Sequence, residues 1–325
     1  MNPARQDRPA LSDQKIGELV RGLDNLRWNL QVQVDIFTLG ERAVPALVRF
    51  LHQPPNQFSD GRVLAAEALG RISGESALQG LLNALSSMKL HGLGPVVRLA
   101  EEEVQDAVAR QLGRIGDRRA VPRLIESLRA SRLTGAAEAL VQFHEVSAIP
   151  WLIEGLDDAF KRDRFALAIQ EMGTGAIPFL IETLARRRFY NRQELLPSLE
   201  RRAKTLQLLA RLGAREAVTA VRLALRDPFD IVLTEAALTF AVLEPGDEVL
   251  EAVPALLAGL THPDFLQRDR CTEALVGIGP RCLPLLEQAM AQDGVMVGIE
   301  AVPLTIHART EVLTILERLK GLVAC

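Results

Sequence analysis

The sequence is poor in aromatic residues and in cysteine. Its 325 residues include two tryptophans, one tyrosine and three cysteines, and aromatics make up 4% of the chain. With so few rings, the core must consist mainly of Leu, Ala, Val and Ile side chains packed between helices. Cys271, Cys282 and Cys325 are too few and too unevenly spaced for a disulfide framework, which is typical of a protein in a reducing cytoplasm.

Long apolar runs and a large excess of one charge are also missing. No run of about 18 apolar residues occurs, so we expect neither a membrane span nor a membrane partner. The stretch MNPARQDRPALSDQ has no apolar segment of the kind found in signal peptides, and we expect residues 1–10 to form a disordered tail. A formal net charge of −3 argues against a surface devoted to nucleic acid or anionic lipid. We therefore predict a cytoplasmic protein.

One phrase recurs along nearly the whole chain. Its clearest copy is LGRIGDRRAVPRLIESL at Leu112–Leu128, and two close copies begin at Leu140 (LVQFHEVSAIPWLIEGL) and Ile169 (IQEMGTGAIPFLIETL). Further copies begin near residues 39, 69, 209, 240 and 275, which gives eight in all. In the three central copies the proline recurs every 28 residues, and a period of this size indicates stacked structural repeats.

The residues of this phrase predict two helices joined by a tight turn. Leu112 and Ile115 end the first helix, and Gly116 follows because a left-handed residue after the last turn costs glycine nothing. Asp117 is placed to cap the next helix, in whose first turn Pro122 is tolerated. That helix carries its apolar residues at i, i+3, i+4 and i+7, namely Val121, Leu124, Ile125 and Leu128. Because one hairpin cannot bury this stripe alone, we expect neighbouring hairpins to stack.

This pattern resembles the HEAT family, in particular the short HEAT-like repeats first described in phycobilisome lyases. The resemblance rests on three phrases, GDRRAVPRLIESL, RDPFDIVLTEAAL and HPDFLQRDRCTEALVGIG. It implies an all-α fold, an α-solenoid with a right-handed superhelical path, built from about eight hairpins over residues 27–291. We expect a capping helix at residues 11–26, and an insertion followed by a C-terminal capping helix at residues 292–325. The resemblance specifies architecture, whereas function has to be argued from a site.

The second helices of the three regular repeats carry the first candidate binding residues. Off their apolar stripes lie Arg123, Trp151 and Phe179, one position after each proline, and Glu126, Glu154 and Glu182, four positions after it. The resemblance implies that second helices line a concave surface, with neighbours about 8–10 Å apart. There we expect an acidic ladder of the three carboxylates beside an exposed tryptophan–phenylalanine pair. The ladder is either a solvated helix face or a docking groove for a basic segment of a partner protein.

A long link at Ala185–Lys204, ARRRFYNRQELLPSLERRAK, provides the second set of candidates. It opens with three arginines, Arg186, Arg187 and Arg188, which a helix C-terminus would stabilise through its dipole. The dipole does not explain the next two residues, Phe189 and Tyr190. Basic residues beside aromatics favour a contact patch for acidic or phosphate-rich partners, and we include Tyr190 in that patch.

The link Ser86–Glu103 has a simpler interpretation. It ends in Glu101, Glu102 and Glu103, and we expect these residues to open the next helix. Negative charge in the first turn suits the positive end of the helix dipole, so no functional role is needed for them.

No set of residues with catalytic or metal-binding spacing is found. None of the five histidines is paired with another at metal-ligand spacing on one helix. The deoxyhypusine hydroxylases, a HEAT-like family, hold two irons with His–Glu pairs in four repeats, whereas only His144–Glu145 has that form here. Cys271 and Cys282 lack the spacing of a zinc site. We therefore predict no catalytic residue, no metal and no cofactor.

These observations favour a non-catalytic scaffold or adaptor that binds another protein through its concave face. The alternative is a bilin lyase or chromophore chaperone of the phycobilisome-lyase type, because Arg123, Trp151, Phe179 and Arg186 suit the propionates and rings of an open-chain tetrapyrrole. Binding of nucleic acid through Arg186–Arg192 is the least favoured, since an acidic groove repels phosphates. A resemblance to the HEAT-like alkylpurine DNA glycosylases is disfavoured for the same reason.

Overall fold

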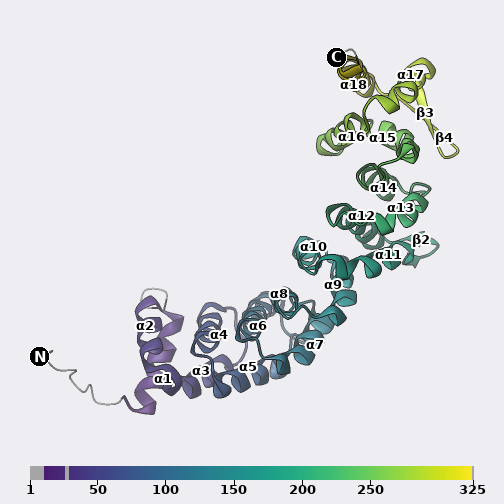
Figure 1. Ribbon diagram of the computed structural model, residues 1–325. Helices are drawn as coiled ribbons and strands as arrows, with labels where there is room; N and C mark the ends of the chain where they lie inside the picture. Colours follow the sequence, from purple (N-terminus) through teal and green to yellow (C-terminus); the bar gives the residue numbers. More distant parts are fainter. Residues whose placement is uncertain (1–10, 26–28, 324–325) are drawn as a thin grey trace, which may run out of the picture. The chain divides into compact units, whose positions relative to one another are not determined.

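Helices account for nearly all the regular structure in the computed structural model, which describes residues 11–25 and 29–323 (Figure 1). The predicted tail, residues 1–10, and Cys325 lie outside the described residues. By its internal contacts the chain divides into two units, Met1–Leu152 and Ile153–Cys325.

The first unit consists of stacked helices. In chain order they are α1 (Asp13–Arg21), α2 (Asn29–Leu39), α3 (Val44–Leu51), α4 (Asp60–Ile72), α5 (Glu75–Ser87), α6 (Pro95–Ile115), α7 (Val121–Ser131), α8 (Thr134–Gln142) and the start of α9 (Ile149–Gly155). One row holds α4, α6 and α8, and the other holds α3, α5 and α7; consecutive members of each row are in contact (Figure 1). Short 3-10 turns lead into α3, α7 and α9. The two rows are therefore the first and second helices of successive hairpins.

The second unit repeats this arrangement. Its helices are α10 (Arg162–Glu171), α11 (Ile177–Ala185), α12 (Leu196–Arg211), α13 (Val218–Ala224), α14 (Asp230–Leu243), α15 (Val253–Gly259), α16 (Phe265–Ile278), α17 (Leu283–Gln292) and α18 (Ile306–Val323). The row of first helices runs from α10 through α12, α14 and α16 to α18, each in contact with the next. The helices α11, α13, α15 and α17 form the other row (Figure 1).

The turn that joins the two helices of a hairpin follows the sequence closely. Gly116 ends α6 in the left-handed region with φ 76°, and an Asp117 carboxylate oxygen accepts a hydrogen bond from the Arg119 amide at 2.9 Å. Pro122 is the second residue of α7, where its missing N–H is harmless. In the next repeat His144 stands in the place of Gly116 and takes φ 50°. His144 is therefore a turn residue.

The core is aliphatic, as the composition predicts. Leu124 and Leu128 of the predicted stripe are fully buried, while Val121 and Ile125 are half-buried. Each fully buried leucine contributes about 1.5–3 kcal/mol of transfer free energy. The stacking of hairpins therefore supplies the hydrophobic stabilisation that a single hairpin lacks.

The prediction that a helix opens at Glu101 is wrong. Helix α6 begins at Pro95, and Glu101 lies inside it with its side chain buried. Its carboxylate forms an ion pair with the buried guanidinium of Arg62 on α4. The helix begins at Pro95 because proline suits the first turn of a helix. Glu101 is buried because the buried guanidinium of Arg62 needs an anionic partner.

Two β-hairpins stand where the sequence suggested only irregular links. Strand β1 (Phe189–Tyr190) pairs antiparallel with β2 (Gln193–Glu194), and β3 (Gly294–Val297) pairs antiparallel with β4 (Glu300–Pro303). Neither hairpin belongs to a larger sheet, and most of their residues are exposed or half-buried. Both are thus surface insertions, and they leave the helical core unchanged.

The predicted fold class, an all-α stack of helical hairpins, is confirmed. The right-handed path, the count of eight hairpins and the assignment of capping helices stay predictions. No helix in the described part of the chain is long and apolar enough to cross a membrane.

Candidate partner-binding site

A cluster of ion pairs holds the β1–β2 hairpin to the second unit. We call it the arginine cluster, and it consists of Arg187, Arg188, Arg201 and Arg202 with Glu154, Asp157, Glu194 and Asp227. Its members come from the end of α9, the loop after it, the hairpin link, α12 and the segment before α14. Four cations and four anions therefore meet around one insertion.

The inner half of the cluster is centred on Arg202 of α12. This side chain is 2% exposed and pairs with Glu194 at 3.1 Å and with Asp227. Its Nε also donates to the Leu184 carbonyl oxygen at 3.1 Å, and Arg187 donates to Asp227 at 2.7 Å. A charge in such surroundings is tolerated only when it is paired and hydrogen-bonded, and Arg202 meets both conditions.

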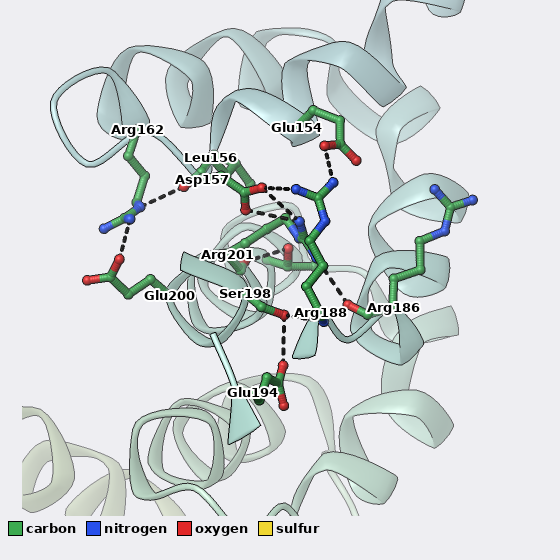
Figure 2. A network of polar contacts seen from close by, with 11 residues as sticks. Glu154, Leu156, Asp157, Arg162, Arg186, Arg188, Glu194, Ser198, Glu200 and Arg201 are labelled. Atoms are coloured by element: carbon green, nitrogen blue, oxygen red, sulfur yellow. Dashed lines mark hydrogen bonds and ion pairs between the residues drawn. The ribbon is translucent and has the colours of Figure 1, made fainter. Parts of the chain in front are cut away.

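The outer half of the cluster joins α12 to the end of α9 (Figure 2). Arg201 donates to Asp157 at 3.0 Å and to the Arg186 carbonyl oxygen at 3.1 Å. Arg188 pairs with Asp157 at 2.5 Å and with Glu154, and the hydrogen bond to Glu154 raises the pKa of Arg188 above its ordinary value. The side chains of Arg188 and Arg201 converge on Asp157 in Figure 2. The link between α11 and α12 is thus fixed at both of its ends.

The hairpin itself has a two-residue turn. Phe189 pairs with Glu194 and Tyr190 with Gln193, which leaves Asn191 and Arg192 at the tip with φ 47° and 66°. Positive φ at both central residues is the type I′ signature, whose twist matches that of the two strands. At the base, Ser198 Oγ accepts from the Arg188 amide at 3.1 Å and donates to Glu194 at 2.8 Å.

The braced hairpin exposes its aromatic side chains. Phe189 is 56% exposed and Tyr190 is 69% exposed, and Leu195 and Leu196 at the start of α12 are also exposed. Covering such apolar surface would release free energy at about 25 cal/mol per Å². An exposed aromatic pair on an ordered support is the kind of surface that anchors protein interfaces.

Three of the predicted binding residues lie in the first unit. Arg123 and Glu126 are exposed on α7 and form an ion pair with each other at 3.3 Å. Trp151 on α9 is half-buried, and the Arg129 guanidinium carbon lies 5.6 Å from the centre of its ring. The tryptophan therefore has a cation–π partner within its own unit.

The remaining predicted residues lie in the second unit. Glu182 is exposed on α11 and pairs with Arg186 at 2.5 Å, whereas Glu154 and Phe179 are half-buried. The structure brings Glu154 and Arg188 together, and it places Tyr190 next to Phe189 on the hairpin. Each carboxylate of the expected ladder thus has an arginine partner. The continuity of the ladder and the pairing of Trp151 with Phe179 stay predictions.

Five members of the cluster were not among the predicted binding residues, namely Arg201, Arg202, Asp157, Glu194 and Asp227. One signal was present: Arg202 lies on the same helical stripe as the buried Leu199, Leu206 and Leu209. A charged residue on an apolar stripe needs a buried partner of opposite sign. The identity of that partner was not readable, because Glu194 and Asp227 lie on segments whose paths depend on the tertiary fold.

The second unit also has a hollow on the row of first helices. Its volume is about 690 Å³, and residues of α12, α14 and α16 line it. The main charged residues there are Arg270 and Glu235, and Arg270 donates two hydrogen bonds to Glu235 at 2.5 and 2.8 Å. This surface belongs to the helix row opposite to the one that carries the predicted residues.

Cys271 and Cys282 are free, buried cysteines. Burial raises the pKa of the Cys271 thiol to about 12 and raises that of Cys282, so both thiols stay protonated near neutral pH. Within residues 11–25 and 29–323 there is no group of three or more His, Cys, Asp or Glu side chains that could hold a metal ion.

Comparison with protein families identifies the repeats. Residues 92–173, which include α7 and α8, match the model described as HEAT repeats. Residues 62–87 match the PBS lyase HEAT-like repeat, the short form of the unit that the sequence resembled. The chain thus contains HEAT repeats of both descriptions. Among curated proteins, none matches the sequence significantly.

Solved structures show likeness in fold alone. Kap121p matches with a TM-score of 0.50 and 13% identity over 95% of this chain, which corresponds to 38% of Kap121p. Human deoxyhypusine hydroxylase in complex with glycerol matches with a TM-score of 0.30 and 20% identity, covering 88% of this chain and 98% of that one. The CpcE–CpcF complex of phycocyanin lyase from Nostoc sp. matches with a TM-score of 0.28 and 21% identity, covering 85% and 94%.

Proposed function

We propose that the protein is a non-catalytic HEAT-repeat scaffold that binds another protein, and that the β1–β2 hairpin of the second unit is a contact point. The observation that carries this proposal is the exposure of Phe189 and Tyr190 on a hairpin whose base is fixed by buried ion pairs. A rigid aromatic anchor loses little conformational entropy on binding, so more of its contact energy appears as affinity. Phe179 and Glu182 on α11, together with Arg186 directly after it, belong to the proposed contact surface.

Replacing both hairpin aromatics should abolish partner capture. The immobilised wild-type chain, the Phe189→Ser/Tyr190→Ser variant and a Phe265→Ser control are each incubated with extract of the native cell, and retained proteins are quantified by mass spectrometry. Phe265 is an exposed aromatic on α16 of the same unit, so it controls for general stickiness. We expect at least one protein to be retained by wild type and control and reduced about tenfold or more by the hairpin variant.

The purified partner is then used to test whether the hairpin contributes to binding. Its Kd for the hairpin variant is measured by calorimetry, after circular dichroism has established that the variant is folded. Identical retention by all three chains, or an unchanged Kd, contradicts a role for the hairpin.

The second candidate function is binding of a bilin. It is supported by the match of residues 62–87 to the PBS lyase HEAT-like repeat, together with the half-buried Trp151 beside Arg129. A ring next to a guanidinium offers stacking and a partner for a propionate.

For bilin binding the expected result is a shift of the phycocyanobilin absorbance spectrum when the purified protein is added. Trp151→Ala should reduce this shift, whereas Phe265→Ala should leave it unchanged. A spectrum that does not change at any protein concentration rules this function out.

A further inference from the structure

We infer that the partner contacts the β1–β2 hairpin through an acidic segment. This inference rests on the proposed function and specifies the chemistry of the partner. It agrees with the contact patch for acidic or phosphate-rich partners expected at the link, and it differs from the basic segment that the ladder of glutamates suggested.

The arginine cluster is neutral as a whole, but its two signs are not equally exposed. The side chains of Glu194 and Asp227 are fully buried and that of Asp157 is 8% exposed. The side chains of Arg188 and Arg187, by contrast, are 44% and 35% exposed. The fourth carboxylate, Glu154, is 33% exposed, whereas Arg201 and Arg202 are only 3% and 2% exposed. The surface of the cluster therefore presents two guanidinium groups and one carboxylate, a net positive charge. Guanidinium groups have donors in a planar fork that suits carboxylates.

The tip of the hairpin adds a further cation. Arg192 is the second residue of the turn, its side chain is exposed, and it forms no hydrogen bond or ion pair with any residue that the structure describes. Tyr190 precedes the turn and is exposed as well. An uncompensated arginine beside an aromatic ring can pair with a carboxylate while the ring covers an apolar side chain.

The glutamates expected to receive a basic segment are already compensated. Glu154 pairs with Arg188, and Glu182 pairs with Arg186 at 2.5 Å. A lysine from a partner would have to displace an arginine from each of them, and that exchange gains little free energy. The arginines of these pairs are compensated in the same way, so the charge that favours an acidic partner is that of Arg192, which has no partner among the described residues.

The same distribution favours a protein over a nucleic acid. Arg186, Arg187 and Arg188 are each held by a carboxylate, so Arg192 is the cation most available for a phosphate. Affinity for nucleic acid depends on neutralising many phosphates at once, and the chain has a formal net charge of −3. An acidic peptide with an apolar anchor needs only one or two such pairs.

A selection with unbiased peptides tests the inference. Random peptides of about 12 residues are displayed, selected on the immobilised full chain, and counter-selected on the Phe189→Ser/Tyr190→Ser variant. We expect the enriched sequences to combine Asp or Glu with an aromatic or leucine residue. Selection on Arg192→Glu should move the mean charge of the enriched peptides toward positive, whereas selection on Arg318→Glu, an exposed arginine on α18, should not.

The enriched peptides are then measured in solution. At about 50 mM NaCl, Arg192→Glu should weaken their binding about tenfold, and the difference should shrink at about 300 mM NaCl because salt screens exposed charges. Enrichment of basic or uncharged peptides, failure to enrich any, or tighter binding of a random oligonucleotide than of the best peptide overturns the inference.

Failure of the acidic-partner inference can be distinguished from failure of the proposed function. If the captured partner is lost with the hairpin aromatics but its Kd is insensitive to Arg192→Glu and to salt, the hairpin binds a partner that is not acidic. If no captured protein depends on the aromatics, the proposed function itself fails.

Discussion

Replacing Arg202 with methionine is expected to destabilise the second unit by about 3–5 kcal/mol. Methionine keeps the length and the apolar stem of the side chain, so the change removes mainly the charge and its hydrogen bonds. Glu194 loses its best-placed cation, because Arg187 contacts it only at 3.9 Å, whereas Asp227 keeps its ion pair with Arg187 at 2.7 Å. One buried carboxylate is then left with insufficient compensation, and the cost is far larger than that of losing a surface ion pair.

The measurement is urea denaturation followed by circular dichroism at 222 nm, combined with hydrogen exchange of peptides from α11 and α12. Exchange is included because repeat proteins do not always unfold as one cooperative unit. The matched control is Arg222→Met, which removes an exposed ion pair with Glu251 in the same unit. Exposed pairs contribute little to stability, so the control should keep the wild-type midpoint. Equal midpoints for the two variants would contradict the structural role of Arg202.

Replacing Gly135 with alanine is expected to destabilise the first unit by about 1–3 kcal/mol. Gly135 lies in the first turn of α8, where its amide donates to the Asp106 side chain at 2.7 Å. A Cβ added there would lie 2.2 Å from the Asp106 carbonyl oxygen on α6. The obstacle is backbone, so it cannot rotate away, and α6 and α8 have to move apart along their contact.

The control for Gly135→Ala is Gly17→Ala on α1. A Cβ at Gly17 would meet nothing within 4 Å, and alanine has a higher helix propensity, so this change should stabilise the unit by about 0.5–1 kcal/mol. Urea midpoints and hydrogen exchange of α6 and α8 are compared for the two variants. If Gly135→Ala is as stable as wild type, the close approach of the two helices is not as described.

Much of the local structure could be predicted because it depends on neighbours in the chain. The turn at Gly116 and Asp117, the entry of Pro122 into the first turn of α7 and the burial of Leu124 and Leu128 each involve residues only a few positions apart. The error at Glu101 has the opposite origin. Its partner, Arg62, lies 39 positions earlier. From the sequence, the acidic residues were therefore attributed to a helix dipole, whereas Glu101 neutralises a buried guanidinium.

The two β-hairpins and the proposed binding surface were predicted less well than the helical repeats. The positive φ angles of Asn191, Arg192 and Gly298 mark the turns of the two hairpins, whose short strands interrupt a pattern of helical repeats. A basic patch at the link was predicted from its three arginines, but the carboxylate partner of each arginine could not be. The pairing depends on which carboxylates the fold places beside which arginines. The formal charges of the link do not reveal this.

The repeating phrase by itself determined that the chain forms stacked helical hairpins with an aliphatic core, because periodic apolar stripes and turn residues act within each repeat. Only the tertiary structure decided that Arg202 is buried between Glu194 and Asp227, that the β1–β2 hairpin is fixed at its base, and that the arginines of the link are paired with carboxylates. The physical reason is that desolvation and ion pairing depend on residues brought together by the fold, such as Arg202 and Asp227, 25 positions apart, and Arg201 and Asp157, 44 positions apart.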